Sequence, residues 1–198
     1  LARLTPDKDF VRDLSAFLKK ELAFQYHPQQ FHSNEIPVTT LVSPPLSKLV
    51  YWCNQKSLNL YAESFCKTMA AQLFKHGSWQ LGISAMMRYA NSLKIDIRKV
   101  KLNDGCGLAD DNLITTHVLA SVLQRQTSDK NYPAFYASLP SINGLNMKSG
   151  YIGGTRSYAG YITLPDSSAA AFAFIIHGYT CSPKEVKLKM FQVLDKLK

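Results

Sequence analysis

The chain has 198 residues, 46% of them hydrophobic, and its 23 Lys and Arg outweigh 14 Asp and Glu to give a net charge of +9. This length and composition suffice for one substantial hydrophobic core, and no apolar run is long enough to span a bilayer. The positive charges are dispersed and form no basic run with interleaved aromatic residues, so we expect no nucleic-acid partner. A solvated basic surface facing an anionic cell envelope is the expected use of the charge.

The first 42 residues are predicted to lead into the main fold. Apolar residues recur at helical spacing over 6–22, which predicts a surface helix. A polar loop over 26–35 and a short strand over 36–42 are expected to follow. The chain begins at Leu1, with neither an initiator Met nor a signal peptide, so we expect that its true beginning is missing.

Three helices are predicted next. Apolar spacing predicts one over 46–56, a second over 59–77 that ends at a glycine, and a third over 78–93 that is capped by a serine. The second helix is expected to bury four apolar residues, Ala62, Phe65, Met69 and Leu73. Ser57 and Asn59 lie on the connection between the first two helices, and a tight loop can aim such short polar side chains into a cleft.

The middle of the chain alternates turns with short elements. Residues 100–102 predict a short strand, and two glycines around a small residue predict a tight turn over 104–107. We expect Thr115 or Thr116 to cap a helix and Pro133 to open another, shorter one.

The last third changes period. Aromatic and β-branched residues over 151–164 and 169–177 predict two antiparallel strands joined by a turn over 165–168. The second run is almost continuously apolar, as expected of a central strand covered on both faces. Ser182 and Glu185 form a capping box that opens a terminal helix, which is expected to lie on the sheet.

The predicted fold class is α/β (α+β), with an antiparallel sheet, a C-terminal helix packed on it and a helical lobe. We expect a single domain over 1–198 that consists of a lead-in helix and strand (1–42), a mostly helical lobe (43–140) and the sheet with its terminal helix (141–198). No internal repeat, low-complexity tract or linker divides the chain.

Lys148, Ser149 and Gly150 form the most informative short motif. The lysine places a point charge beside a hydroxyl, and the glycine removes a side chain where a ligand backbone would approach a strand edge. The backbone N–H of Tyr151 follows as a candidate donor to a developing oxyanion. A peptide that ends in a carboxylate suits this set of groups.

Two further motifs precede this one, Ser57-Leu58-Asn59 and Asp104-Gly105-Cys106-Gly107-Leu108. In this order the three motifs resemble those of penicillin-recognising serine enzymes. The resemblance is to the D-alanyl-D-alanine carboxypeptidases/endopeptidases of the penicillin-binding protein 4 type, and it runs from about Ser43 to about Gly178. Cys106 stands where that family usually has serine, and the segment before Lys148 is shorter than usual.

The resemblance implies a role for each site residue. Ser57 would help to pass a proton to the leaving amine, and Asn59 would orient the substrate amide. Lys148 would supply positive potential, Ser149 would hydrogen-bond the terminal carboxylate, and the Tyr151 N–H would be one oxyanion-hole donor. The implied partners are peptidoglycan stem peptides and β-lactam antibiotics, in the periplasm or cell envelope of a bacterium. The expected domain is transpeptidase-like and incomplete at its N-terminus.

The family's nucleophile motif, S-x-x-K, is not found at its expected place. The one such string is Ser64-Phe65-Cys66-Lys67, inside the helix that begins near Asn59, whereas the family's nucleophile lies far upstream of S-x-N. We therefore interpret Ser64 as a chance match. Either the chain is the C-terminal part of a longer enzyme and inert by itself, or it is a degenerate, non-catalytic peptide-binding module.

Each candidate also has a purely structural interpretation. Ser57 and Asn59 are residue types that favour helix caps, Lys148 is one that protects edge strands from aggregation, and Asp104 is a turn former. The four cysteines and five histidines show no metal-ligand spacing, and we expect neither a metal nor an organic cofactor. The sequence carries no signal for an oligomeric state.

Overall fold

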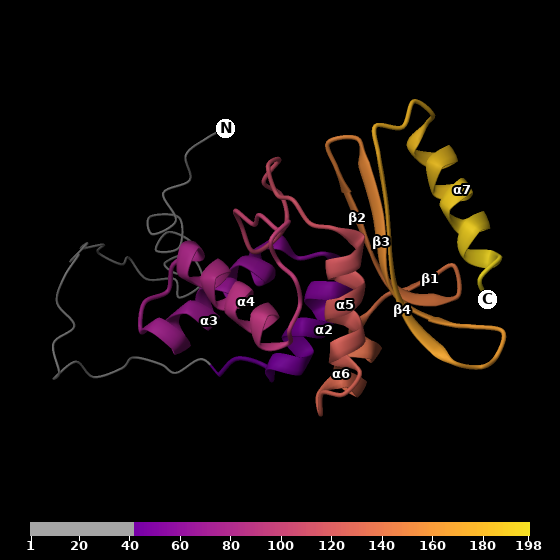
Figure 1. The fold of residues 1–198 in the computed structure, drawn as a ribbon. Coiled ribbons are helices and arrows are strands. Elements are labelled where there is room, and N and C mark those ends of the chain that lie inside the picture. The colour runs from indigo at the N-terminus through magenta and orange to yellow at the C-terminus, as the bar shows by residue number, and fades with distance from the viewer. Residues whose placement is uncertain (1–41) are drawn as a thin grey trace, which may run out of the picture. The chain divides into compact units, whose positions relative to one another are not determined.

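The computed structural model describes residues 42–198, and Ser43–Lys198 form one compact unit. The helix predicted over 6–22, and the strand predicted over 36–42 apart from its last residue, lie outside the described residues. The elements follow in the order α2 Leu46–Lys56, α3 Asn59–Phe74, α4 Trp79–Ser92, α5 Thr116–Gln126, α6 Tyr132–Ser138, β1 Ser141–Ile142, β2 Leu145–Ile152, β3 Thr155–Thr163, β4 Ala169–His177 and α7 Pro183–Asp195 (Figure 1). Within residues 42–198, no helix combines the length and apolarity needed to cross a membrane.

The four strands form one antiparallel sheet in the order β1-β2-β3-β4. β2 pairs with β3 along its whole length, but β1 pairs only with its first two residues, Leu145 and Asn146. Among the described residues, β2 therefore has an open edge from Lys148 onward. The predicted fold class is confirmed: an antiparallel sheet, a terminal helix packed on it and a helical lobe.

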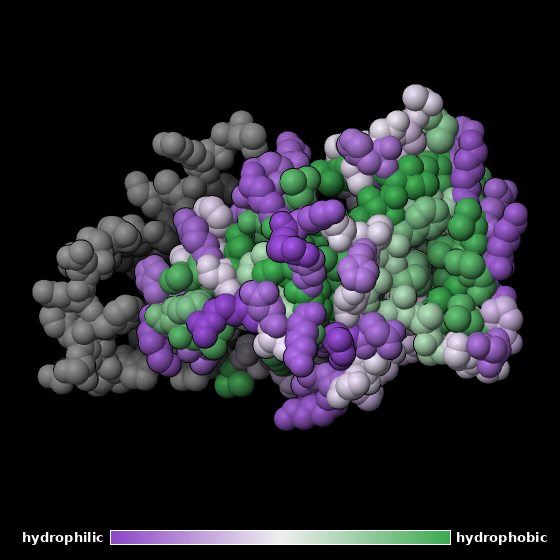
Figure 2. All heavy atoms as spheres, viewed as in Figure 1, coloured by the Kyte–Doolittle hydropathy of each residue, from purple (hydrophilic) through white to green (hydrophobic). Residues whose placement is uncertain are grey.

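The hydrophobic core lies between the sheet and α7. Its buried members come from β2, β3 and α7, and they are Leu145, Met147, Tyr158, Ile162, Val186, Met190 and Leu194. Apolar residues gather along this seam in Figure 2, whereas the outer surface of α7 is hydrophilic. Ser182 accepts a hydrogen bond from the Glu185 N–H at 3.2 Å, which confirms the predicted cap of α7.

The opposite face of the sheet packs against α5 (Figure 1). The Tyr161 hydroxyl in β3 donates a 2.9 Å hydrogen bond to the Leu123 carbonyl of α5, and burial raises the pKa of this tyrosine. Within the helical lobe, α3 and α4 approach closely at Gly82, where a Cβ atom would lie 2.3 Å from the Cys66 carbonyl oxygen. The terminal helix, the sheet and the lobe thus form three successive layers.

Several boundaries differ from the sequence prediction. The segment 151–164 is not one strand, because Gly153 and Gly154 take left-handed φ values of +50° and +71° and turn the chain from β2 into β3. The strand predicted over 100–102 shrinks to one bridge between Lys101 and Leu113. The helix predicted over 59–77 ends at Phe74, and its buried residues are Cys66 and Ala70 in place of those predicted.

Candidate active site

Two of the predicted site residues, Lys148 and Ser57, are in direct contact although they are 91 residues apart in the chain. The Lys148 Nζ donates a hydrogen bond to the Ser57 Oγ and a second one, of 3.0 Å, to the carbonyl oxygen of Ser149. The loop between α2 and α3 and the open edge of β2 therefore meet at this lysine.

The end of α2 places the Ser57 hydroxyl. Ser57 has left-handed backbone angles, φ 52° and ψ 52°, and its N–H donates to the Cys53 carbonyl. The Leu58 N–H donates to the same oxygen at 3.2 Å. The backbone of Ser57 thus closes α2, while its side chain is used for the contact with Lys148. Its hydroxyl is not a helix cap, contrary to the structural interpretation considered above.

Asn59 is the first residue of α3, and its side chain is exposed. Its neighbour Leu58 occupies the N-cap position of the helix and cannot cap it with a side chain. Asn59 lies two residues after Ser57, at the start of α3, but no hydrogen bond joins it to Lys148. The structure brings Ser57 and Lys148 together and leaves Asn59 exposed.

Lys148 is about half buried. Burial lowers the pKa of its amine, and the nearby Cys53 thiol opposes that shift. Burial has the opposite effect on the Cys53 thiol, whose pKa it raises, and the Lys148 charge opposes this rise. The amine therefore loses its proton more readily than an exposed lysine does, which suits a group that exchanges a proton with a hydroxyl.

The backbone of β2 presents its polar groups to the open edge at alternate residues. The Met147 N–H points away from β3, because it donates a 3.0 Å hydrogen bond to the Pro140 carbonyl. Since successive residues of a strand alternate, the N–H and C=O groups of Ser149 and Tyr151 point the same way. The Tyr151 N–H is thus directed to the edge where a ligand strand would lie.

The side chains of Lys148 and Ser149 leave β2 on opposite faces. Lys148 is on the face of the sheet that carries Tyr161 and packs on α5. Ser149 pairs with Tyr158, whose ring lies 5.4 Å from that of Phe191 in α7, so it is on the other face. The two side chains therefore flank the open edge from its two sides.

Gly150 pairs with Ser157 of β3. A Cβ atom on Gly150 would lie 2.5 Å from the Ser157 Oγ. The sequence interpretation was that a ligand backbone requires this glycine, but the neighbouring strand supplies a second reason for it.

The loop 104–108 is held by carboxylates. Glu63 of α3 accepts hydrogen bonds from the N–H groups of Gly105 and Cys106 at 2.8 and 3.0 Å. Asp104 accepts three backbone N–H groups and the Asn112 amide, at 2.6 to 3.0 Å. Burial opposes ionisation of Asp104, but these hydrogen bonds outweigh it and lower its pKa. Asp104 is thus a turn former, and Glu63 anchors its loop to α3, a role that no local pattern indicated.

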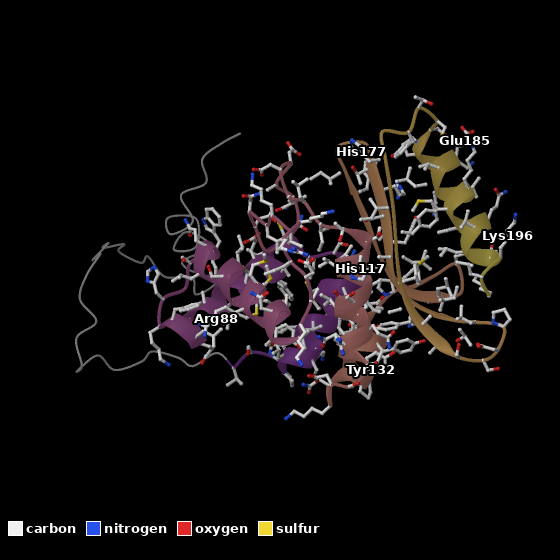
Figure 3. All side chains as sticks on the ribbon, in the orientation of Figure 1. Arg88, His117, Tyr132, His177, Glu185 and Lys196 are labelled. Carbon is white, nitrogen blue, oxygen red and sulfur yellow. The ribbon has the colours of Figure 1, made fainter. Side chains whose placement is uncertain are left out.

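Candidate metal ligands come together at one place in residues 42–198. Oxygen and sulfur atoms of Glu63, Asp104 and Cys106 lie within 4.8 Å of one another. Because backbone N–H groups already occupy the two carboxylates, we assign no metal to them. His117 and His177 lie on different elements (Figure 3), and the latter lies beside Thr155, with 2.6 Å between its Nδ1 and the threonine Oγ1.

Ser64, the serine of the S-x-x-K string, lies on an exposed part of α3. Its hydroxyl donates a 2.7 Å hydrogen bond to the Leu60 carbonyl of the same helix. This placement directs the hydroxyl along α3, whereas the contact with Lys148 is made by Ser57.

Comparison with known proteins extends the resemblance. The D-Ala-D-Ala carboxypeptidase 3 (S13) family matches residues 4–146. A D-alanyl-D-alanine carboxypeptidase of Actinomadura sp. (strain R39) is 24% identical over 159 residues, which cover 70% of this chain and 29% of the relative. The D-alanyl-D-alanine carboxypeptidase DacB of Haemophilus influenzae is 28% identical over 167 residues, covering 75% and 35%. The chain thus spans about a third of the length of these relatives.

Solved structures show the same fold. Penicillin-binding protein 4 of H. influenzae, crystallised with a β-lactam, superposes with a TM-score of 0.78 at 22% identity, over 100% of this chain and 51% of that protein. A class A β-lactamase of Bacteroides cellulosilyticus gives a TM-score of 0.56 at 16% identity, over 77% and 61%. Together with the family match over 4–146, these findings confirm the resemblance: the chain belongs to the D-Ala-D-Ala carboxypeptidase 3 (S13) family.

Proposed function

We propose that this chain is part of a serine-type D-Ala-D-Ala carboxypeptidase/endopeptidase that acts on peptidoglycan peptides through an acyl-enzyme. The observation that carries the proposal is the hydrogen bond from Lys148 to Ser57, beside the open edge of β2. It joins two of the family's motifs at a place where an extended peptide can add to the sheet. The setting would be the periplasm or cell envelope of a bacterium.

The geometry supports a specific arrangement of the substrate. A peptide along the open edge of β2 would meet the Tyr151 N–H, which is directed outward there. Its terminal carboxylate would lie between the Lys148 amine and the Ser149 hydroxyl, which flank the edge from the two faces of the sheet. Charge-assisted hydrogen bonds of this kind contribute about 1.5–3 kcal/mol each.

The chemistry would use the same residues. Ser57 would pass a proton from Lys148 toward the leaving amine, and the Asn59 amide would orient the scissile peptide from the start of α3. The Tyr151 N–H would stabilise the oxyanion, a contribution of about 3 kcal/mol in serine hydrolases. The nucleophile would come from chain outside these 198 residues, because the Ser64 hydroxyl is directed along its own helix.

The proposal is tested by measuring peptide binding and peptide hydrolysis by this chain. We expect the chain to bind a peptide that ends in D-Ala-D-Ala, to bind its C-terminally amidated form less tightly, and to hydrolyse neither. Lys148→Ala should weaken binding of the free acid by roughly tenfold or more, for loss of a charge-assisted contact. Equal affinity for acid and amide, or no effect of Lys148→Ala, would contradict the proposal.

A labelled penicillin separates the enzyme from a non-catalytic binding module. A longer protein that contains this chain and an upstream S-x-x-K segment should form a covalent adduct. Lack of an adduct in a longer protein that still binds the peptide would favour the module.

A further inference from the structure

A second polar contact joins α2 to α6, the helix that precedes the sheet, about one helical turn behind the Ser57 loop. Ser138, the last residue of α6, is completely buried, and its Oγ accepts a 2.7 Å hydrogen bond from the Asn54 amide of α2. The same hydroxyl donates to the Phe135 carbonyl at 2.6 Å. The Ser138 carbonyl accepts from the Gln55 amide at 3.0 Å. We call Asn54, Gln55 and Ser138 the α2–α6 clamp.

The clamp lies between the two segments that make the site. Asn54 and Gln55 are three and two residues before Ser57, the C-cap residue of α2. Ser138 is followed by Leu139 and Pro140, and the Pro140 carbonyl accepts from Met147, the residue before Lys148. The clamp is therefore connected to the contact between Lys148 and Ser57 by a short covalent path on the Ser57 side and through the hydrogen bond between Met147 and Pro140 on the Lys148 side.

The clamp is well suited to fix a distance. Ser138 is buried and its hydroxyl both accepts and donates, and a fully satisfied buried network is rigid. Both clamp residues of α2 present primary amides, and neither carries a charge that salt would screen. Removing a partner would leave a buried polar group without its hydrogen bond, which is destabilising.

The Ser57 loop needs such a support. Ser57 has a φ of 52°, a backbone conformation that residues other than glycine seldom adopt. Such a conformation persists only where the surrounding structure imposes it. The hydrogen bonds to the Cys53 carbonyl impose it from within α2, but they do not set the position of α2 relative to β2.

We propose that Asn54 and Ser138 are positioning residues, whose hydrogen bond holds the Ser57 hydroxyl against the Lys148 amine. Their importance for turnover rests on the proposed function, but the contact that they position is observable without turnover. The class of substrate is unchanged; the clamp determines how well the two motifs are aligned to receive it.

The experiment uses the full chain with 13C-labelled lysine and follows the Lys148 side-chain signal by NMR as pH is varied. The variants are Asn54→Ala, Ser138→Ala and the double variant. The control is Tyr161→Phe, which removes a hydrogen bond of 2.9 Å between the sheet and α5 at another junction. Thermal unfolding of all four measures the structural cost.

We expect the pKa of Lys148 to rise toward that of an exposed lysine in both single variants. The double variant should show the same rise and no more. Affinity for a peptide ending in D-Ala-D-Ala should fall by roughly tenfold, the equivalent of one hydrogen bond of about 1.4 kcal/mol. Tyr161→Phe should lower the unfolding temperature but leave the pKa of Lys148 unchanged.

Should Asn54→Ala leave the Lys148 signal unchanged while lowering the unfolding temperature as Tyr161→Phe does, the clamp is structural only and the inference is wrong. Because Asn54 is only partly buried, this variant decides the matter even if Ser138→Ala does not fold. Failure of the proposed function has a different signature, namely no peptide binding in the unmodified chain while its Lys148 signal is still shifted.

Discussion

The N–H of Ser57 donates to the carbonyl oxygen of Cys53 while Ser57 holds a left-handed φ of 52°. At the C-terminal end of a helix this conformation is usually taken by glycine, because a Cβ atom costs about 1 kcal/mol there. The chain has serine at this position, and its hydroxyl contacts Lys148. The strain is thus retained together with the contact.

Ser57→Gly should therefore separate stability from ligand binding. We expect the free energy of unfolding to stay the same or rise by up to about 1 kcal/mol, because relief of the left-handed strain offsets the greater freedom of the unfolded chain. Affinity for a D-Ala-D-Ala peptide should fall, since the hydroxyl is lost.

Ser57→Ala is the matched control for this variant. It also removes the hydroxyl but keeps the strained Cβ, so it should bind as weakly and be less stable than Ser57→Gly in urea unfolding. A glycine variant less stable than the alanine variant would contradict the proposed origin of the strain.

Gly150→Ala tests why a glycine follows Ser149. The new Cβ would lie 2.5 Å from the Ser157 Oγ, so this serine must change its rotamer and the single variant should be destabilised by no more than about 1 kcal/mol. Adding Ser157→Ala removes the clashing oxygen and should restore stability.

Peptide affinity then distinguishes the two reasons for the glycine. If ligand approach also requires it, the double variant folds like the unmodified chain but binds weakly. Recovery of both properties would mean that only the neighbouring strand requires it.

Asp104 should make stability depend on pH. Its folded-state pKa is lowered, so the stability that it contributes is present above the unfolded pKa of about 3.9 and is lost as pH falls through the lower folded value. The difference in unfolding free energy between the unmodified chain and Asp104→Asn should therefore be largest above pH 4 and shrink below it. Urea unfolding between pH 2 and 6 measures this difference in unfolding free energy. A difference that grows toward low pH would contradict the prediction.

Met190 tests the packing of α7 on the sheet. Its side chain is 0% exposed, so Met190→Ala should lower the free energy of unfolding by about 2–5 kcal/mol. Leu188→Ala on the same helix removes a side chain that is 52% exposed and should change it by no more than about 0.5 kcal/mol. Similar losses in the two variants would mean that α7 does not pack on the sheet as described.

Local patterns predicted most of the elements. The caps at Ser78, Thr115 and Ser182 accept the hydrogen bonds expected of them, and the strand 169–177 has the predicted bounds. These features depend on neighbours within a few residues, so the sequence contains their causes. The hairpin at Gly153 was missed, because the aromatic and β-branched run continues on both sides of it.

The features of the site also fall into two groups, those that the sequence predicts and those that depend on long-range contacts. The sequence by itself determined the order of the motifs and the family, and it predicted Ser57 and Lys148 as site residues. Only the tertiary structure decided that these two residues touch, that Glu63 anchors the loop after Asp104, and that Ser138 holds α2. Those contacts span 42 to 91 residues, and which distant groups meet depends on how whole helices and strands pack, which no local pattern contains.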